Sequence, residues 1–499
     1  MDVQLKNNLE RLRKHSEING YYGGLTSLFM LDAWTAIPPK GRPYRSKMSG
    51  FFAGEQLRHQ TSNEAKELIA CLEGVDLEDD IQQAMLRELK REYAYNTAIS
   101  PEKMAQVTEL TSEAQAVWKE AHEKSDYNLF KPYLKQIFDL NRELADLIGL
   151  DGHPLNSLAA RFEPEIDVEK VAALFADLKI GIIDLLGKIT AGAADIDDSF
   201  FHQDFDKTQV FEFTKHVVET MGYDAQAGGY GEVLHPFCAM IGPNDARITS
   251  NYSNFKFGVF AGIHEAGHGM YGQNSDAALA DTGLWGGIMG AVHESQSRFY
   301  ENILGKSRAF WSGFFPEAKR RFAQFADVDL DQFYRALNRV EPSLKRITSD
   351  EVTYSLHPII RFEIEKEVLE DKVSVDELQD VWNAKYKAFL GVEPPNDREG
   401  VLQDVHWSMG LFGYFQSYSL GNLYGGQLLA QLKKEVPTAF TEIAAGNFKP
   451  VNTWFQENVH GPSRVLTPDA LVKKVTGEEL SARYFVDYLN QKYSEIYGL

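Results

Sequence analysis

Two histidines and a glutamate, in the sequence His264-Glu265-Ala266-Gly267-His268, form the strongest chemical motif in the chain. The surrounding segment, Phe255–Gly272, is predicted to be a helix, so His264 and His268 lie one turn apart on the same face. Two imidazoles at this spacing can bind one zinc ion, with the glutamate beside the open coordination position. The pattern therefore predicts a metal centre in which Glu265 takes a proton from a water molecule.

A third metal ligand has to come from another part of the chain. Tyr271 and Asn274 occupy the positions at which a metzincin has glycine and histidine, so that class is excluded. Glu294, on a later predicted helix, is the expected ligand, because two imidazoles and one carboxylate leave a zinc ion with net positive charge and a free position. Glu301, further along the same helix, is the alternative. His293 is expected to form a hydrogen bond beside the metal rather than to bind it.

Composition limits the partners of such a site. The 499 residues include 51 Lys and Arg against 72 Asp and Glu, a formal net charge of −21, which argues against nucleic acid as a partner. No apolar run is long enough to predict a membrane span. Cys71 and Cys238 are too few for a disulfide framework, and the polar first ten residues contain no apolar signal region, so a cytoplasmic location is expected. Cys238 is expected to be a buried free thiol.

The elements that position these residues are predicted to be helical. Apolar residues recur at three- and four-residue spacing in residues 4–18, 80–98, 102–124, 129–149, 168–190 and 479–497. Ala246–Tyr252, just before the metal-binding helix, is the best candidate strand. Pro358, inside the helical pattern Tyr354–Glu367, should kink or restart that helix. The sequence therefore predicts an all-α fold with a minor β-sheet near the metal site.

The chain shows no internal repeat and no low-complexity linker. The best candidate boundaries are Ala191–Asp206 and Gly228–Gly231, but neither has the composition of a domain linker. We therefore expect a single domain over residues 1–499. Its first part, residues 1–200, is expected to be a mainly helical cover, and residues 201–499 carry the motifs.

Further motifs follow in a fixed order: His235-Pro236-Phe237, Asp245-Ala246-Arg247-Ile248-Thr249, His293-Glu294-Ser295-Gln296, Ile360-Arg361-Phe362-Glu363 and Gly400-Val401-Leu402-Gln403-Asp404-Val405-His406-Trp407. With these motifs the chain resembles the carboxypeptidase Taq family of zinc-dependent metallocarboxypeptidases over nearly its whole length. It departs from the family at Leu31-Asp32, where the family usually has tryptophan and aspartate. This departure lies outside the metal motifs.

The resemblance implies a large, saddle-like helical body with a deep active-site groove. It implies one zinc ion at the floor of the groove, which cobalt can replace, and a homodimer. It also implies removal of single residues from peptide C-termini with broad side-chain tolerance, proline being disfavoured. The single expected domain is then a peptidase domain.

An enzyme of this kind must hold a terminal carboxylate within an acidic protein. Arginine suits this task because its planar fork binds a carboxylate through two hydrogen bonds. The resemblance places the carboxylate-binding arginine at Arg361, and His357 would share its helix face. The alternative is a structural ion pair of Arg361 with Glu363 or Glu365.

Three other residues are candidates for binding substrate. Arg247 is the second candidate for the terminal carboxylate, and the alternative is an Asp245–Arg247 pair that only stiffens the wall of the groove. His235 is expected near the substrate or as a buried structural histidine.

The reaction also needs a neutral donor for the oxyanion that develops during hydrolysis. His406, with Tyr418 or Tyr414, fits this role, and the sequence does not choose between the two tyrosines.

Two other functions compete with this interpretation. A zinc oligopeptidase of similar helical fold would share the metal motif but would need no arginine for a free C-terminus. A helical scaffold with an inactive motif would not need Glu265, and replacing that residue would change nothing.

Overall fold

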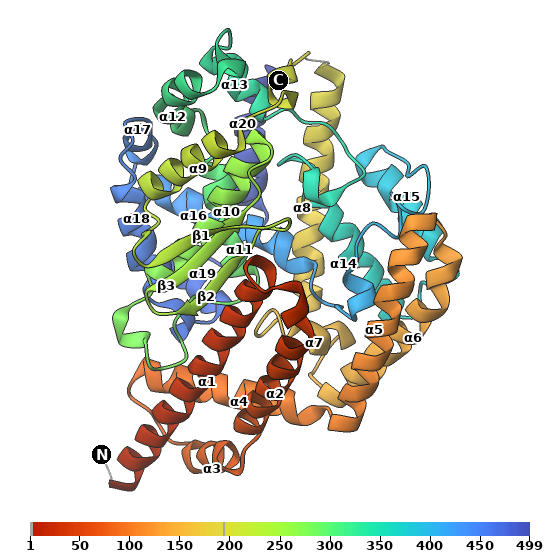
Figure 1. The fold of residues 1–499 in the computed structure, drawn as a ribbon, viewed down its shortest axis with the longest axis vertical. Coiled ribbons are helices and arrows are strands. Elements are labelled where there is room, and N and C mark those ends of the chain that lie inside the picture. Colours follow the sequence, from red (N-terminus) through yellow and green to blue (C-terminus); the bar gives the residue numbers. More distant parts are fainter. Residues whose placement is uncertain (1–2, 193–194) are drawn as a thin grey trace.

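The computed structural model describes residues 3–192 and 195–499, and almost all of its regular structure is helical (Figure 1). The first half contains the helices α1 (Val3–Thr35), α2 (Arg42–Gln60), α3 (Asn63–Leu72), α4 (Asp80–Ala98), α5 (Pro101–Lys124), α6 (Tyr127–Ile148), α7 (Pro154–Ala159), α8 (Val168–Gly192) and α9 (Lys207–Met221). The predicted all-α fold is confirmed.

A small sheet and the remaining helices follow. The strands are β1 (Gly228–Glu232), β2 (Cys238–Gly242) and β3 (Asp245–Ser250). The helices of this half are α10 (Phe255–Gln273), α11 (Ala291–Arg298), α12 (Arg308–Arg321), α13 (Leu330–Leu337), α14 (Leu356–Leu369), α15 (Leu378–Leu390), α16 (Gln416–Glu435), α17 (Ala439–Ala444), α18 (Lys449–Phe455), α19 (Pro468–Thr476) and α20 (Arg483–Tyr497).

The sheet lies directly before α10, the helix with the predicted metal ligands, as expected from the sequence. In the described ranges its strand order is β1–β3–β2, with β1 parallel and β2 antiparallel to β3. The β2–β3 connection turns through Asn244, whose φ of 62° lies in the left-handed region that asparagine tolerates. β3 packs against α10 and β2 against α1, so the sheet joins the N-terminal helices to the metal-binding helix.

The predicted helices are present, with differences that have physical causes. Ser100 caps α5 through the Lys103 N–H, and Pro101 fits the first turn, so that helix begins close to its predicted start. Pro358 lies in the first turn of α14, where a missing N–H leaves no helix bond unmade, so the helix begins there without a kink. No prediction covered α2, because none of its residues is buried and its sequence has no apolar stripe.

Among the residues that the structure describes, most buried apolar side chains fall into two separate clusters. The larger one joins helices from α5 to α20. The smaller one joins α1, α3 and α4 to Leu279 and Leu284, which follow the metal-binding helix. Of the two candidate boundaries, Ala191–Asp206 includes residues 193 and 194, which lie outside the described ranges. A single domain over the whole chain remains a prediction.

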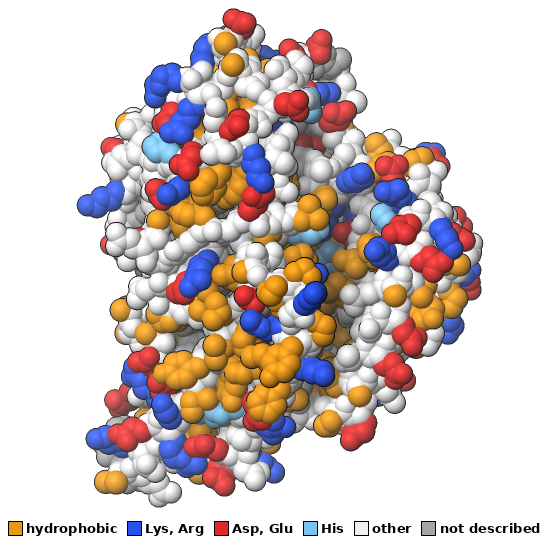
Figure 2. Space-filling view, viewed as in Figure 1, with side chains coloured by type: hydrophobic (Ala, Val, Ile, Leu, Met, Phe, Trp, Pro, Cys, Tyr) orange, Lys and Arg blue, Asp and Glu red, His pale blue; other side chains and the backbone are white. Residues whose placement is uncertain are grey.

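The surface differs between these parts. Large apolar side chains gather over α1 and α2 in Figure 2, among them Trp34, Tyr44 and Phe51, which are all more than half exposed. The same view shows a hollow in this face with histidine side chains inside it. Within the described ranges, the longest helices are too polar to cross a bilayer.

Candidate metal centre

The centre lies where α10 and α11 cross, with α16 packed against α11. Gly267 is at the crossing, and a Cβ atom there would lie 2.8 Å from the Gln296 oxygen and from the Ser297 Cα. Gly421 of α16 is equally confined, since its Cβ would lie 2.8 Å from Glu294 Cγ. Glycine at both positions lets three helices approach closely enough for their side chains to share one site.

Three predicted ligands converge there. Glu294 Oε2 lies 3.8 Å from His264 Nε2 and 3.7 Å from His268 Nε2. One ligand atom from each residue lies within 4.8 Å of the others. Ligands bound to one zinc ion at tetrahedral angles are about 3.3 Å apart, so a small adjustment suffices for all three to bind a common ion. The donor set of two imidazoles and one carboxylate thus fits a divalent metal.

Hydrogen bonds to the other ring nitrogens hold both histidines in the required tautomer. His264 Nδ1 donates to Glu301 Oε2 at 2.8 Å, so Nε2 is the ring nitrogen that remains to bind a metal in place of its proton. His293 lies 3.1 Å from the Gly286 carbonyl through Nε2 and 2.6 Å from His268 Nδ1 through its own Nδ1. If His293 donates to that carbonyl, it accepts from His268, whose Nε2 is then free.

Glu301 therefore lies behind a ligand rather than among the ligands. Its carboxylate also accepts from Arg298 at 3.3 Å. Burial opposes the ionised form, but Arg298 and His264 outweigh it and lower the pKa of Glu301 to about 2. The geometry favours Glu294 over Glu301 as the third ligand and gives His293 the hydrogen-bonding place expected from the sequence.

The charge of the site suits a cation. Burial disfavours a charged His264, but the carboxylates of Glu294 and Glu301 outweigh it and raise its pKa to about 9. Glu265 is 6% exposed, and burial raises its pKa to about 7 with a further contribution from Glu294. A carboxylate with a pKa near neutrality is well matched to taking and returning a proton.

Cys238 on β2 lies close to this carboxylate. Its Sγ is 3.9 Å from Met240 Sδ, and the side chain is partly buried. Burial, together with the charge of Glu265, raises the pKa of the thiol well above its usual value. The thiol is therefore protonated. The sequence predicted a buried free thiol, and the structure shows a free thiol that is only partly buried.

Three tyrosines and a histidine face the centre from the other side. The ring of Tyr414 lies 5.4 Å from that of Tyr418 and 5.6 Å from that of His406. Burial raises the pKa of both phenols, and the negative charge of Glu294 raises it further. Both phenols are therefore close enough to Glu294, a predicted metal ligand, to be influenced by its charge. Tyr354 lies beside Tyr418, with the Arg298 guanidinium 3.8 Å from its ring centroid.

His406 is neutral in this environment. Its side chain is 16% exposed, and burial lowers its pKa to about 4, against the opposing charge of Asp404. Its Nδ1 lies 3.8 Å from the Asp404 carboxylate, too far for a hydrogen bond. A neutral imidazole and neutral phenols can donate hydrogen bonds without placing a second cation next to the metal.

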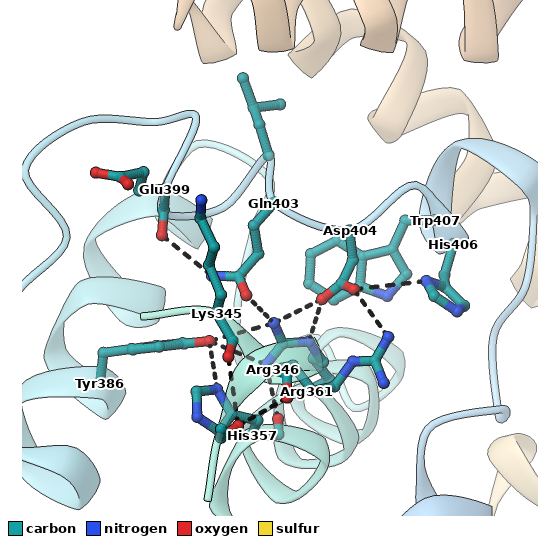
Figure 3. Close-up of polar contacts among 12 residues, drawn as sticks. Lys345, Arg346, His357, Arg361, Tyr386, Glu399, Gln403, Asp404, His406 and Trp407 are labelled. Carbon is teal, nitrogen blue, oxygen red and sulfur yellow. Dashed lines mark hydrogen bonds and ion pairs between the residues drawn. The ribbon is translucent and has the colours of Figure 1, made fainter. Parts of the chain in front are cut away.

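Arg361, the predicted carboxylate-binding residue, lies in the core instead. It is 0% exposed, and Figure 3 shows its contacts with Asp404, Gln403 and Tyr386. Its guanidinium donates to Asp404 at 2.6 Å, to Gln403 at 2.8 Å and to the His357 carbonyl at 2.8 Å. Since these groups already use its donors, Arg361 does not fit direct contact with a substrate. The alternative ion pair of Arg361 with Glu363 or Glu365 is not formed either. Glu363 pairs with two lysines, and Glu365 accepts a hydrogen bond from Trp407.

Arg346, unlike Arg361, is slightly exposed and has a hydrogen-bond donor that no other described residue uses. Its side chain is 9% exposed, and its contacts to Asp404 at 3.3 Å and to the Tyr354 hydroxyl at 3.4 Å are long. Among the described residues, its Nε has no hydrogen-bond partner. Arg346 also lines a cavity of about 400 Å³ together with Lys345, Arg398 and Gln403. The sequence missed this residue, because it lies in an irregular segment whose only local signal is two adjacent basic residues.

Known proteins share this architecture. The sequence pattern of the carboxypeptidase Taq (M32) metallopeptidases matches residues 11–493. The chain belongs to this family. It is 39% identical to carboxypeptidase 1 of Bacillus subtilis, with 96% of each chain covered, and 37% identical to thermostable carboxypeptidase 1 of Thermus thermophilus, with 95% and 96% covered. The crystal structure of an M32 carboxypeptidase from Deinococcus radiodurans superposes with a TM-score of 0.95 at 32% identity, covering 99% of this chain and 100% of that one.

The chain is therefore a carboxypeptidase, a peptide hydrolase of a family that uses a divalent metal. The resemblance stated from the sequence is confirmed. Peptides are its substrates.

The remaining residues predicted to bind substrate have other surroundings in this carboxypeptidase. Arg247 donates to Asp245 through two bonds of 2.7 and 2.8 Å, the pairing expected as the alternative. His235 is exposed, so it is not the buried structural histidine that the sequence offered as one of two alternatives. His357 is fully buried, with Nδ1 3.0 Å from the Tyr386 hydroxyl, so it does not face a substrate directly.

A second group of possible metal ligands is explained without a metal. His153, Glu169 and Glu370 lie close together. His153 Nδ1 accepts the Leu155 N–H at 3.1 Å, so the proton of the neutral ring is on Nε2 and that nitrogen cannot bind a metal. Lys366 already neutralises both carboxylates, at 3.1 and 2.6 Å.

Proposed function

We propose that this carboxypeptidase depends on zinc and removes single residues from peptide C-termini, with Glu265 as the general base. The observation that carries the proposal is the pairing of a three-ligand site with a nearby arginine that has an unused donor. His264, His268 and Glu294 would hold one metal ion per subunit, with cobalt as a possible replacement. When bound, the ion would polarise the scissile carbonyl and lower the pKa of water.

The protein's own groups would move the proton. Glu265 is buried beside the ligand pair, and its pKa of about 7 allows it to accept a proton from water. The same carboxyl group can then deliver that proton to the leaving amine. Its partner Cys238 is protonated and does not compete as a base or nucleophile.

Neutral donors would stabilise the oxyanion. His406, Tyr414 and Tyr418 form a cluster of one imidazole and two phenols, and both phenols lie within the influence of the Glu294 charge. Their pKa values keep them uncharged near neutrality, so each can donate a hydrogen bond as negative charge develops on the carbonyl oxygen.

Arg346 would bind the terminal carboxylate. Its existing contacts are long and its buried Nε has no partner among the described residues, so the guanidinium still has donors that a carboxylate could use. Arg361 would act indirectly, by holding Asp404 in place through a bond of 2.6 Å. Arg247, Asp245, His235 and His357 are then expected to shape the surroundings rather than to bind the carboxylate.

Broad side-chain tolerance, weak cleavage at proline, a homodimer and a cytoplasmic location complete the proposal. They rest on the family resemblance and on the acidic, cysteine-poor composition. Light scattering of the purified protein tests the dimer, because a monomer would give half the expected mass.

The decisive experiment follows one unstructured peptide of about ten residues by mass spectrometry, as the free acid and as the C-terminal amide, with and without chelator. We expect sequential loss of single residues from the free acid only, abolished by chelator and restored by Zn²⁺ or Co²⁺. Internal cuts in both peptides would favour an oligopeptidase instead. Cleavage that survives complete metal removal would refute the metal-dependent mechanism.

A further inference from the structure

The helix that carries Glu294 begins without a cap of its own. Gly290 precedes α11 with φ 68° and ψ −132°, and no side chain in the helix accepts from its first turn. The cap comes from a distant residue: the Ala291 N–H donates to Glu163 Oε1 at 2.6 Å. The fit is tight, since a Cβ on Gly290 would lie 2.4 Å from both Glu163 Oε1 and the Phe162 oxygen.

This first turn of α11 contains residues that define the metal centre. The Glu294 N–H donates to the Gly290 carbonyl at 3.0 Å, so the ligand is one turn from the capped end. His293, which orients His268, lies in the same turn. A change in the direction of this turn would therefore move one ligand and the support of another.

Glu163 is held firmly by its own segment. It lies between α7 and α8, where its N–H donates to the Ala159 carbonyl at 2.8 Å, and it is 4% exposed. Burial raises the pKa of the carboxyl group to about 8, with no cation among the groups that lower it. A buried carboxyl without a basic partner is costly unless its hydrogen bonds serve the structure.

We propose that Glu163 is a positioning residue for the metal site: by capping α11 from the helical cover, it fixes the direction in which Glu294 presents its carboxylate. The proposal rests on the proposed function in taking Glu294 as a ligand. It extends that function by making metal affinity depend on a residue from the first part of the chain that does not touch the metal.

A second buried carboxyl group provides a matched comparison. Glu365 is fully buried, accepts from the Gly413 N–H at 2.9 Å and from Trp407 Nε1 at 2.8 Å, and has a pKa raised by burial to about 8. Glu365 differs from Glu163 in the segment that its hydrogen bonds position. They hold the segment around His406, whereas Glu163 holds the helix that carries Glu294. Removal of Glu365 should disturb the protein as much but leave the ligands in place.

The test measures Zn²⁺ affinity by competition with a chromophoric chelator, on metal-stripped full-length protein. Glu163→Ala should weaken binding by about tenfold to a hundredfold, whereas Glu163→Gln, which keeps an acceptor oxygen, should stay within about threefold of the wild type. Glu365→Ala should also stay within about threefold. The visible spectrum of the Co²⁺ form should change in Glu163→Ala alone, because it reports ligand geometry.

Ala291→Pro provides a second route if Glu163→Ala folds poorly. Proline is favoured at the first position of a helix, and here it removes the N–H that Glu163 accepts and places its ring against that carboxyl group, so affinity should fall as in Glu163→Ala. Unchanged affinity in both variants would overturn the proposal, and so would an equal loss in Glu365→Ala. Because binding is measured without substrate, these outcomes are independent of whether the wild type acts on C-termini.

Discussion

On the α10–α11 side of the site, the reactive residues come from two regular helices that cross at a glycine, and each histidine is oriented by a hydrogen bond to its second nitrogen. The second side is formed by His406, Tyr414 and Arg346, which lie outside the α-helices, in short 3-10 turns or a loop, and are held by buried ion pairs and by Glu365. The first side is built to bind a cation. The second side presents neutral donors and positive charge, which suit the negative groups of a substrate.

Replacing the base should have the largest effect and should separate catalysis from metal binding. Glu265→Gln cannot accept a proton, so kcat should fall by about 10² to 10⁴, while the bound metal measured by mass spectrometry stays at the wild-type level. Loss of metal in this variant would mean that the residue has a structural part in the centre. Activity near that of the wild type would show that Glu265 is not the general base.

The two tyrosines sharpen the description of the second side. The phenol that donates to the developing oxyanion should lose about 10² in kcat when changed to phenylalanine, with little change in KM. The other variant should stay within a few-fold of the wild type. Steady-state kinetics of Tyr414→Phe and Tyr418→Phe decide between them. Equal, small effects in both would transfer the role to His406.

Replacing Arg346 should impair substrate binding, whereas replacing Arg361 should impair stability. Arg346→Ala should raise KM for a free-acid peptide by about tenfold to a hundredfold, since charge-assisted hydrogen bonds to the carboxylate are lost. Arg361→Ala should instead lower the free energy of unfolding by about 3 to 5 kcal/mol, because Asp404 is left buried with a weaker partner. Kinetics and urea unfolding of both variants test this difference. A KM effect confined to Arg361→Ala would restore the role predicted from the sequence.

The last prediction concerns a change of stability with pH. The pKa of Glu365 is raised from 4.5 to about 8 in the folded protein, so folding favours the protonated group. Its contribution is fully present below about pH 4.5 and is lost as the pH rises to about 8, by at most about 1.4 kcal/mol per pH unit.

Glu365→Gln stays neutral and should flatten the decline in unfolding free energy over this pH window. Urea unfolding at three pH values compares the variant with the wild type. Parallel curves for the two proteins would contradict the assignment.

The metal side could be predicted in detail because its signal is local. The spacing of His264 and His268 on one helix defines their relation, and Glu294 follows in a recognisable motif. Arg346 and Glu163 escaped prediction for the opposite reason. Their roles depend on contacts across more than fifty residues, with Asp404 and with the start of α11, and no periodicity in the sequence encodes such contacts.

The helices, too, divide into those with a local sequence signal, which could be predicted, and those without one. Helices with one buried face, such as α6, were predicted from their apolar stripe. α2 has no buried residue and was missed. For Arg361, the motif gives the residue type but not whether its side chain points into the core or toward the substrate.

The separate apolar cluster of α1, α3 and α4 has a consequence for how the molecule comes apart. A unit with its own small set of apolar contacts can open and close again while the larger body stays folded. Amide hydrogens of residues in these helices should then exchange with solvent at a common, lower free energy than those of α10 and α16. Proteases would find their first cleavage sites in the N-terminal helices, long before the metal-binding helices are exposed.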